Sequence, residues 1–570
     1  MFIRIKPTAK PNKKKVQICE SVRQGAKVKQ VIVRHVGIAH DEKELESLKK
    51  LGKVLIAQIL EERNGPFLFP IEDLEEADTY LKEQSDKPLA VVSETKTNER
   101  KSHTVDLDDL SEQKRIVEGF HDVFGALFNS LGFNHILPKK KSDVLKELIL
   151  ARIATPASKR ASQERLKADF GIDIHLDRIY RMMDALVEKQ EAFQAKVFES
   201  TQSMCFEKVD MIFFDVTTLY FESIEEDGLR EFGYSKDQKF HSTQVVMALA
   251  TTQDGLPVGY KLFPGNTAEV SSLLRCLEEW KKTLPIGATT IVADRAMMSE
   301  TNMQTLEEAG IKYVIAAKLK KLPTEIRKDI LEKSGSEISI GKESYALQEH
   351  ILPNGRRLIV THSDKRERKD KKDREQMIEK LSKKIGSGKN VKTLVSNRGY
   401  QKYLMTEGTS NIILNEQKLA EEEQWDGLHG LITNDHDSNA LELLQCYRRL
   451  WVIEESFRIQ KTDLSIRPIY HFKPERVHAH ILLCYLSFAL IRYAEHRIKL
   501  QKKKISIQDI KRSLWRTQAS ILKDHKTGIF YRVPSKPSKT AQEIYQTFGL
   551  IRNERIRPIE QACSAQKSHL

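Results

Sequence analysis

The sequence predicts a mixed α/β fold from a buried-strand pattern, a hairpin signal and a later alternation of helical and strand-like periods. The run MIFFDVTTLYF at 211–221 is apolar, aromatic and β-branched, and a Gln-Asp-Gly turn joins the strand-like runs 244–251 and 256–263. Helical and strand-like patterns then alternate over 268–283, 289–293, 299–309 and 312–317. A hairpin-rich sheet that leads into βαβ crossovers is typical of mixed α/β domains.

Length and composition exclude a mainly disordered chain. The 570 residues are 40% hydrophobic and 31% charged, which supplies a sizeable core and suggests about three to four domains at roughly 150 residues each. The formal net charge is +14 and the isoelectric point is about 9.2. Such a charge fits a polyanionic partner and equally fits an ordinary basic soluble enzyme.

Cysteine usage and hydropathy predict a cytoplasmic protein with no membrane partner. The six cysteines show no CxxC spacing and are expected to be reduced thiols. The start of the chain lacks the apolar core of a secretory signal. The longest apolar stretch, Ile481–Ile491, is too short to span a bilayer and predicts a buried helix.

Changes in pattern divide the chain into six parts. The first two are a small basic β/α unit with a linker (1–100) and a helical region (101–205). The α/β core follows in two parts (206–320 and 436–500), which a mostly β insertion (321–435) separates. The last part is a basic tail (501–570). In the helical region, Lys139, Lys140, Lys141, Lys159 and Arg160 lie at the ends of an apolar stripe. This arrangement fits binding to a DNA backbone, and a solvated charged surface explains it as well.

Two aspartates stand where strands of the predicted sheet end. Asp215 lies within IFFDVTTLY and Asp294 follows TTIVA. Burial of an unpaired charge is costly, so each carboxylate needs a cation or a hydrogen-bond network. At the ends of strands in one sheet, the two side chains could face a common crevice; taken singly, each is more simply a structural hydrogen-bonding group.

A later helix supplies a third acid. Tyr447, Glu454 and Lys461 are spaced by seven residues, about two turns, and therefore share one helix face. Three converging carboxylates would repel one another unless a divalent metal were bound, and ligation by oxygen alone favours Mg²⁺ or Mn²⁺ over zinc. Two such ions can activate a nucleophile and stabilise the leaving oxygen of a phosphodiester. Glu454 alone could equally be a salt-bridge partner, but the order Asp, Asp, Glu is more specific.

These residues lie in a series of motifs, at 213–223, 230–240, 254–269, 292–299, 426–434 and 447–471. With them the sequence resembles an insertion-sequence DDE transposase of the bacterial IS-four (YREK) group, over about 150–500. The resemblance implies a ribonuclease H-like catalytic core interrupted by a mostly β insertion, with a helical N-terminal DNA-binding region. It also implies that Asp215, Asp294 and Glu454 are the catalytic residues and the ligands of two Mg²⁺ or Mn²⁺ ions.

Further DNA contacts follow from the same resemblance. Tyr447 and Lys461 match the Y-x2-R-x3-E-x6-K signature, whereas Leu450 stands at its Arg position. Arg449 or Arg448 could supply that charge, although each points about 100° or more away around the helix.

The other expected DNA contacts each have a simpler alternative. Arg295 could touch a phosphate or could be an ordinary surface arginine, and Trp425 could stack on a base or could be packed in the insertion. Lys236 and Lys239 form a basic turn that could lie over the DNA. His429 holds the position where some relatives stack a flipped base on a tryptophan.

The function implied is cut-and-paste transposition by a metal-dependent polynucleotidyl transferase and endonuclease. The enzyme would cleave at terminal inverted repeats and transfer strands to target DNA. Its partner would be double-stranded DNA, which would make it a nucleoid-associated protein of the cytoplasm. The resemblance further implies a homodimeric synaptic complex, cleavage in trans and a hairpin intermediate. Two alternatives remain: a catalytically decayed or domesticated sequence-specific DNA-binding protein, and a structure-selective nuclease with no joining step.

Overall fold

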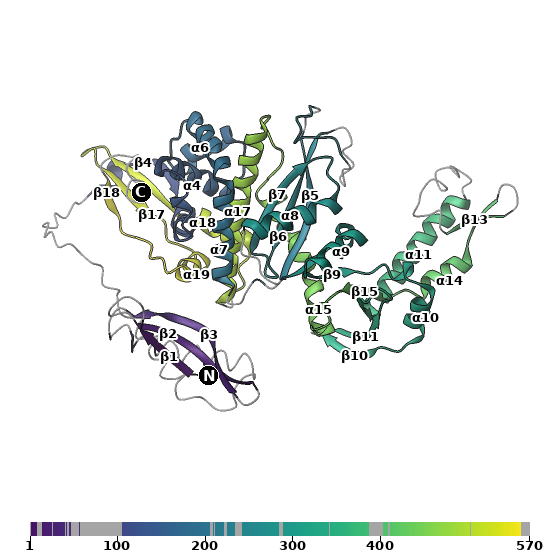
Figure 1. The fold of residues 1–570 in the computed structure, drawn as a ribbon. Coiled ribbons are helices and arrows are strands. Elements are labelled where there is room, and N and C mark those ends of the chain that lie inside the picture. The colour runs from purple at the N-terminus through teal and green to yellow at the C-terminus, as the bar shows by residue number, and fades with distance from the viewer. Residues whose placement is uncertain are drawn as a thin grey trace. The chain divides into compact units, whose positions relative to one another are not determined.

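The chain divides into two compact units, 1–104 and 105–570 (Figure 1). The computed structural model describes single positions at 42, 45, 46, 49, 56 and 209, together with the ranges 2–7, 14–24, 27–39, 105–205, 211–221, 225–233, 242–283, 289–340, 343–386, 403–407, 411–501 and 503–559. The first unit contains an antiparallel sheet of β1 (Phe2–Pro7), β2 (Lys14–Gln24) and β3 (Lys27–Ala39).

A nine-stranded sheet forms the centre of the second unit. In order across the sheet, its strands are β10 (Ser336–Ile340), β11 (Glu343–Ile351), β12 (Arg357–His362), β15 (Leu428–Thr433), β9 (Lys312–Ala316), β8 (Thr290–Ala293), β5 (Met211–Tyr220), β6 (Gln244–Thr251) and β7 (Pro257–Pro264). The strands β5, β6 and β7 are antiparallel neighbours, whereas β8 runs parallel to both β5 and β9. The predicted mixed α/β fold is confirmed, and this strand order is consistent with a ribonuclease H-like core.

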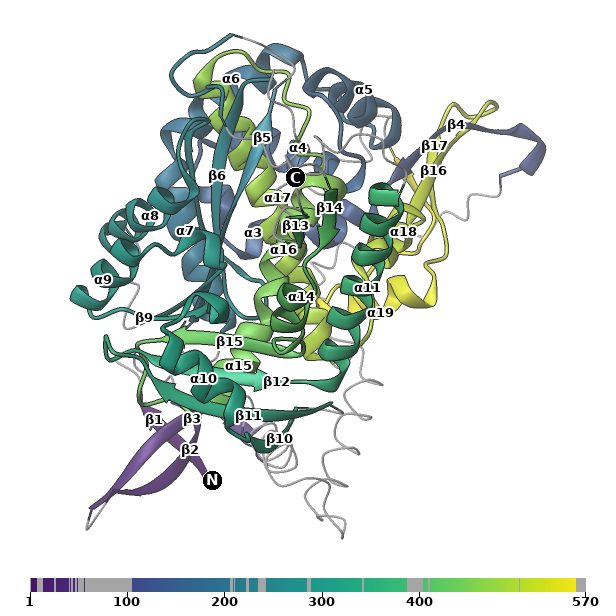
Figure 2. The ribbon, with the colours of Figure 1, turned by 90° about the vertical axis from the view of Figure 1, so that its right-hand side faces the viewer.

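Helices cover both faces of the sheet (Figure 2), and the alternation of side chains along the strands makes both faces apolar. Phe213 and Val292 pack with the helix α17 (Pro474–Leu500), and we call this side the α17 face. Phe214 and Ile291 pack on the other side with α8 (Glu269–Thr283) and α9 (Glu300–Glu308).

Helix α17 is the central helix of the core. It is long and apolar enough to cross a membrane by length and composition alone, but 94% of its most apolar 18-residue window is buried inside the protein. It contains the segment 481–491, which was predicted to be a buried helix.

The strands of the expected insertion continue the core sheet. β15 pairs with β9 on one side and with β12 on the other, both antiparallel. Between β12 and β15 the chain leaves the sheet to form α11 (Asp364–Gly386), β13 (Leu404–Glu407), β14 (Asn411–Leu414) and α14 (Glu416–Glu423). These four elements have an apolar cluster of their own around Leu381 and Tyr403.

The region 105–205 is helical after one strand. Its elements are β4 (Leu110–Val117), a π-helical turn at His121–Gly125, α3 (Ala126–Ser130), α4 (Lys139–Ala154), α5 (Lys159–Asp169), α6 (Leu176–Glu188) and α7 (Gln190–Met204). Apolar side chains of α4, α6 and α7 join the α17-face core.

The expectation of a basic tail after residue 500 is wrong, because most of this segment is folded. It forms α18 (Ile507–Trp515), β16 (Gln518–Asp524), β17 (Phe530–Pro534), α19 (Lys539–Thr547) and β18 (Arg557–Ile559). β16 pairs with β4, which completes a four-stranded sheet of β18, β17, β16 and β4. The pairing partner lies about four hundred residues earlier in the sequence, so no local pattern could reveal it.

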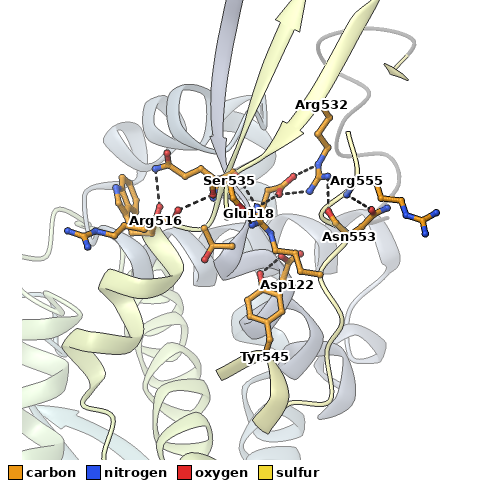
Figure 3. Close-up of polar contacts among 12 residues, drawn as sticks. Glu118, Asp122, Arg516, Arg532, Ser535, Tyr545, Asn553 and Arg555 are labelled. Carbon is orange, nitrogen blue, oxygen red and sulfur yellow. Dashed lines mark hydrogen bonds and ion pairs between the residues drawn. The ribbon is translucent and has the colours of Figure 1, made fainter. Parts of the chain in front are cut away.

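A buried ionic network ties this C-terminal segment to the helical region (Figure 3). The Glu118 carboxylate accepts hydrogen bonds from Arg532, through Nε at 2.6 Å and Nη2 at 2.5 Å, and from Arg552 Nη2 at 3.1 Å. The Tyr545 hydroxyl donates to the Asp122 carboxylate. Since the side chains of Glu118 and Arg532 are only 6% and 4% exposed, these bonds replace the water that both groups lose on folding.

Candidate active site

The two strand-end aspartates are neighbours in the sheet. In the parallel β5–β8 pair, Phe214 lies opposite Ala293. Asp215 directly follows Phe214, and Asp294 directly follows Ala293, so the two aspartates stand side by side at the point where β8 ends. Adjacent strands lie about 4.8 Å apart, which places the two backbones within reach of a shared ligand.

Both aspartates belong to the α17 face. Phe213 and Val292 lie on that face, and side chains two residues further along a strand share it. Helix α16 (Trp451–Arg458) packs on the same face through Ile453.

Helix α16 also carries the third acid. Glu454 is exposed and lines a cavity together with Asp294 and Tyr447. The fold therefore brings the three sequence-predicted acids to one end of the β5–β8 pair.

Local hydrogen bonds orient the two aspartates. The Oδ1 of Asp215 accepts from the backbone N–H of Val216 at 2.8 Å, and the Oδ1 of Asp294 accepts from that of Arg295 at 2.6 Å. Asp294 thereby caps the 3₁₀ turn Arg295–Met297, which starts directly after β8.

The three acids offer only oxygen donors, which are the ligands that hard divalent cations prefer. Within the described part of the chain, His362, Asp364 and Glu367 form a separate group whose ligand atoms all lie within 4.8 Å of one another.

Tyr447 and His429 form the aromatic wall of the cavity. Tyr447 ends α15 (Ala440–Tyr447), and its ring centroid lies 5.6 Å from that of His429 on β15. Burial, reinforced by the negative charges of Asp294 and Glu454, raises the pKa of Tyr447 to about 12. Burial, with a smaller effect of Arg366, lowers the pKa of His429 to about 4. At neutral pH the tyrosine is therefore a hydroxyl donor and the histidine is uncharged.

The two arginines beside Leu450 point in different directions. Arg448 lines the cavity, donates to the Glu343 carboxylate at 3.0 Å and lies over the Tyr345 ring. Arg449 instead donates to the Gln253 side chain at 3.0 Å and lines a separate pocket. Of the two candidates for the missing signature arginine, Arg448 has the position to act.

The remaining predicted residues are dispersed. Arg295 follows Asp294 and is partly exposed, and Lys461 is partly exposed in the π-helical turn Ile459–Asp463 that continues α16. Trp425 is half-buried and packs against the apolar cluster that contains Leu319 and Ile330. This position agrees with the alternative that Trp425 is a packed tryptophan. The predicted contacts Lys236 and Lys239 lie outside the described residues.

Sequence reasoning did not single out the basic side of the cavity. Lys365, Arg366 and Lys369 of α11 line it together with Glu343. The Lys365 ammonium and further hydrogen bonds lower the pKa of Glu343 to about 2, so this carboxylate stays ionised and fixes Lys365 at 2.6 Å. The signal in the sequence is the charged run after residue 363, in which basic and acidic residues are interspersed, a pattern that is most simply a solvated helix face.

Comparison with known proteins places these observations in a family. Residues 210–490 match the family described as Transposase DDE domain. No curated protein gives a significant match.

Three solved structures are similar at low identity. The piggyBac transposase synaptic complex with hairpin DNA is 9% identical with a TM-score of 0.36, and the match covers 70% of this chain and 77% of that one. The Mos1 transposase paired-end complex with left transposon end is 11% identical with a TM-score of 0.14, covering 46% and 72%. The Mos1 mariner paired-end complex with Mn is 9% identical with a TM-score of 0.14, covering 46% and 72%.

The range matched by the family contains the strands β5 to β9, the helices α16 and α17 up to residue 490, and all three acids. Over these residues the chain is therefore similar to the Transposase DDE domain family.

Proposed function

We propose that the protein is a cut-and-paste transposase of the IS-four (YREK) group. It would cleave DNA at the terminal inverted repeats of its element and join the freed 3′ ends to target DNA. The proposal is supported by the adjacency of Asp215 and Asp294 in the β5–β8 pair, and by the cavity that Glu454 shares with Asp294. Hydrolysis and joining of phosphodiesters is the chemistry that such a set of carboxylates serves.

The donor set fits the metal that this chemistry needs. Asp215, Asp294 and Glu454 would hold Mg²⁺ or Mn²⁺, most simply as two ions, since all three offer only carboxylate oxygens. When bound, the ions supply Lewis acidity and activation of the attacking hydroxyl. Tyr447 would donate its hydroxyl to a phosphate oxygen, and Arg448 and Lys365 would offset the charge of the strand.

The proposal extends to the DNA ends and the assembly. The helical region within 105–205 would contact the terminal repeats, and two copies of the chain would hold the paired ends, each cleaving the end bound by the other. A hairpin on the element end would be the intermediate. The support for these steps is the resemblance of the signature helix, with Tyr447, Glu454 and Lys461.

Cleavage and joining of a defined substrate test this function. The full chain is incubated with duplex DNA carrying the ends of the element and with target plasmid, in Mg²⁺. We expect nicked and joined products, and we expect EDTA to abolish both while the DNA stays bound. Cleavage without joined products would instead indicate the nuclease alternative, and undiminished cleavage in EDTA would contradict the metal assignment.

One observation favours a second candidate, a DNA-binding protein that has lost catalysis. Leu450 occupies the signature arginine position and lines the same cavity as Tyr447 and Glu454. This candidate requires sequence-specific binding to the element ends with no metal-dependent nicking.

The Leu450 position yields a prediction. Leu450→Arg should tighten binding to element-end DNA by about tenfold, because a charge-assisted contact to phosphate is worth roughly 1.5 kcal/mol. Fluorescence anisotropy with labelled end DNA measures the effect, and Leu450→Met is the uncharged control. Equal affinities for the two variants would show that position 450 does not reach the DNA.

A further inference from the structure

A second cavity, of about 620 Å³, lies away from the acids. The end of α4, the start of α5, the segment that follows the signature helix, and α6 and α17 surround it. Its lining is basic and aromatic, and includes Arg152, Lys159, Arg160, Tyr180, Arg467, Tyr470, His471 and His480. Within the described part of the chain, the lining includes no carboxylate.

Two of the cations are buried without an anionic partner. Arg152 is 3% exposed and Lys159 is 4% exposed. Among the described residues, the hydrogen bonds of Arg152 all go to backbone carbonyl oxygens. These belong to Leu464 at 3.2 Å, Ser465 at 3.1 Å and Ala157 at 2.9 Å. No described carboxylate forms an ion pair with either cation. Buried charges are normally paired, so this arrangement is costly unless an anion binds.

The surroundings of Lys159 are uniformly positive or neutral. Its Nζ lies 3.0 Å from Nδ1 of His480 on α17. Burial, and then the charge of Arg152, lowers the pKa of Lys159 to about 7. The amine is therefore about half protonated at neutral pH, and a bound anion would favour its charged form. Burial and the charges of Lys159 and Arg476 lower the pKa of the facing His471 to about 4, so that ring is neutral.

The start of α5 adds a further attraction for anions. This helix has 11 residues, and Ser158 caps it by accepting from the Ala161 N–H at 3.2 Å. Its first N–H groups and the positive end of its dipole therefore lie beside the two buried cations.

Aromatic side chains stand beside the cations. Tyr470 lines the cavity and is 64% exposed. Tyr180, also in the lining, carries Arg476 over its ring at 4.5 Å. Exposed aromatic rings beside cations are the usual platform for the bases of unpaired nucleic acid.

The cavity lies within reach of the three acids along one DNA strand. Arg467 stands 4.5 Å over the ring of Tyr220, which is five residues beyond Asp215 on β5. Five residues of strand span about 17 Å at about 3.3 Å each. That length corresponds to about five nucleotides of B-form DNA, at about 3.4 Å per nucleotide.

We propose that this cavity holds a backbone phosphate of an unpaired DNA strand leading from the cleavage site, with the adjoining base stacked on Tyr470. The proposal rests on the proposed function, because it assumes that DNA occupies the three-acid site. Because Arg152 and Lys159 are buried in the lining while Tyr470 is exposed, a separated strand can bring one phosphate and a free base to them more readily than a duplex can.

Lys159→Met tests the assignment against a matched control. Lys167→Met removes the same charge from the same helix at an exposed position, where Lys167 pairs with Asp173 at 2.7 Å. Affinities of both full-length variants are measured for a labelled 30-nucleotide single strand and for the corresponding duplex, in Mg²⁺-free buffer at fixed salt. We expect Lys159→Met to lose about tenfold in single-strand affinity and Lys167→Met to lose less than about twofold.

Thermal denaturation adds a readout that a structural role would not give. A lysine kept for folding would lower Tm when replaced, whereas a lysine kept for a ligand should raise it, because methionine fills the same space without a buried charge. We therefore expect Lys159→Met to be more stable than the wild type and to bind a single strand more weakly. The opposite pair of results, lower Tm with unchanged affinity, would overturn the proposal.

The remaining outcomes separate this proposal from its foundations. Wild-type protein that binds neither form of DNA would reject the proposed function itself. Normal single-strand binding by Lys159→Met, or a loss confined to the duplex, would reject the cavity as an unpaired-strand site. Competition by inorganic phosphate at millimolar concentration that is as effective as competition by the strand would show a free-phosphate site and would also reject it.

Discussion

Glu454→Gln is expected to reduce DNA strand cleavage by about 10³-fold or more, a loss of about 4 kcal/mol in transition-state stabilisation at 1.36 kcal/mol per tenfold. Glutamine keeps the size of the side chain but removes the charge that a divalent cation requires. Because Glu454 is exposed, the substitution should leave folding unchanged. Initial rates of cleavage of end DNA in saturating Mg²⁺ provide the measurement.

The neighbouring acid gives a matched control. Glu455 pairs with Arg492 at 3.3 Å and lines the pocket that contains Arg449, on another side of α16. Glu455→Gln should therefore cleave DNA at close to the wild-type rate. Asp215→Asn and Asp294→Asn should behave like Glu454→Gln while keeping affinity for end DNA. Substantial cleavage by any of the three would reject the triad.

Glu118→Ala is expected to cause the largest loss of stability, about 3–5 kcal/mol, because it leaves two buried arginines without their counter-charge. Arg532 and Arg552 both form ion pairs with this carboxylate, and Figure 3 shows Arg532 beside it. Chemical denaturation of the full chain, followed by circular dichroism, measures the change.

An exposed ion pair on the preceding strand serves as the comparison. Glu112 pairs with Arg115 at 2.9 Å, with side chains 39% and 59% exposed. Glu112→Ala should cost less than about 1 kcal/mol, since exposed pairs contribute little. Similar losses for the two variants would mean that burial of the Glu118 network does not determine its contribution.

The α/β core could be predicted from the sequence because its signals are local. The run around Asp215 alternates between two buried faces, and the Gln-Asp-Gly turn marks the following hairpin. The two aspartates could be identified as candidates because a carboxylate at the end of an apolar strand is costly unless a cation or hydrogen bonds stabilise it. Their adjacency depends on the β5–β8 register, which follows from the crossover and agrees with the shared-crevice hypothesis.

Features that depend on distant pairing could not be predicted. The strands of the expected insertion join the core sheet through β9 and β15, and no local pattern distinguishes an extension of a sheet from a separate subdomain. Lys159 shows the same limit at the level of one residue. Its sequence context, a basic helix start, suggested a surface cation, and only the packing of α17 against α4 and α5 buries it.

The pairing of β4 with β16 also governs how the protein can be made. During synthesis, Leu110–Val117 leaves the ribosome about four hundred residues before its hydrogen-bonding partner Gln518–Asp524 exists. Pairing between strands so far apart in the sequence is slow to form. Until it forms, the unpaired edge of β4 can associate with other chains. Shortened chains that stop at the end of α17 should accordingly need chaperones or form inclusion bodies, even though they contain every residue of the three-acid site.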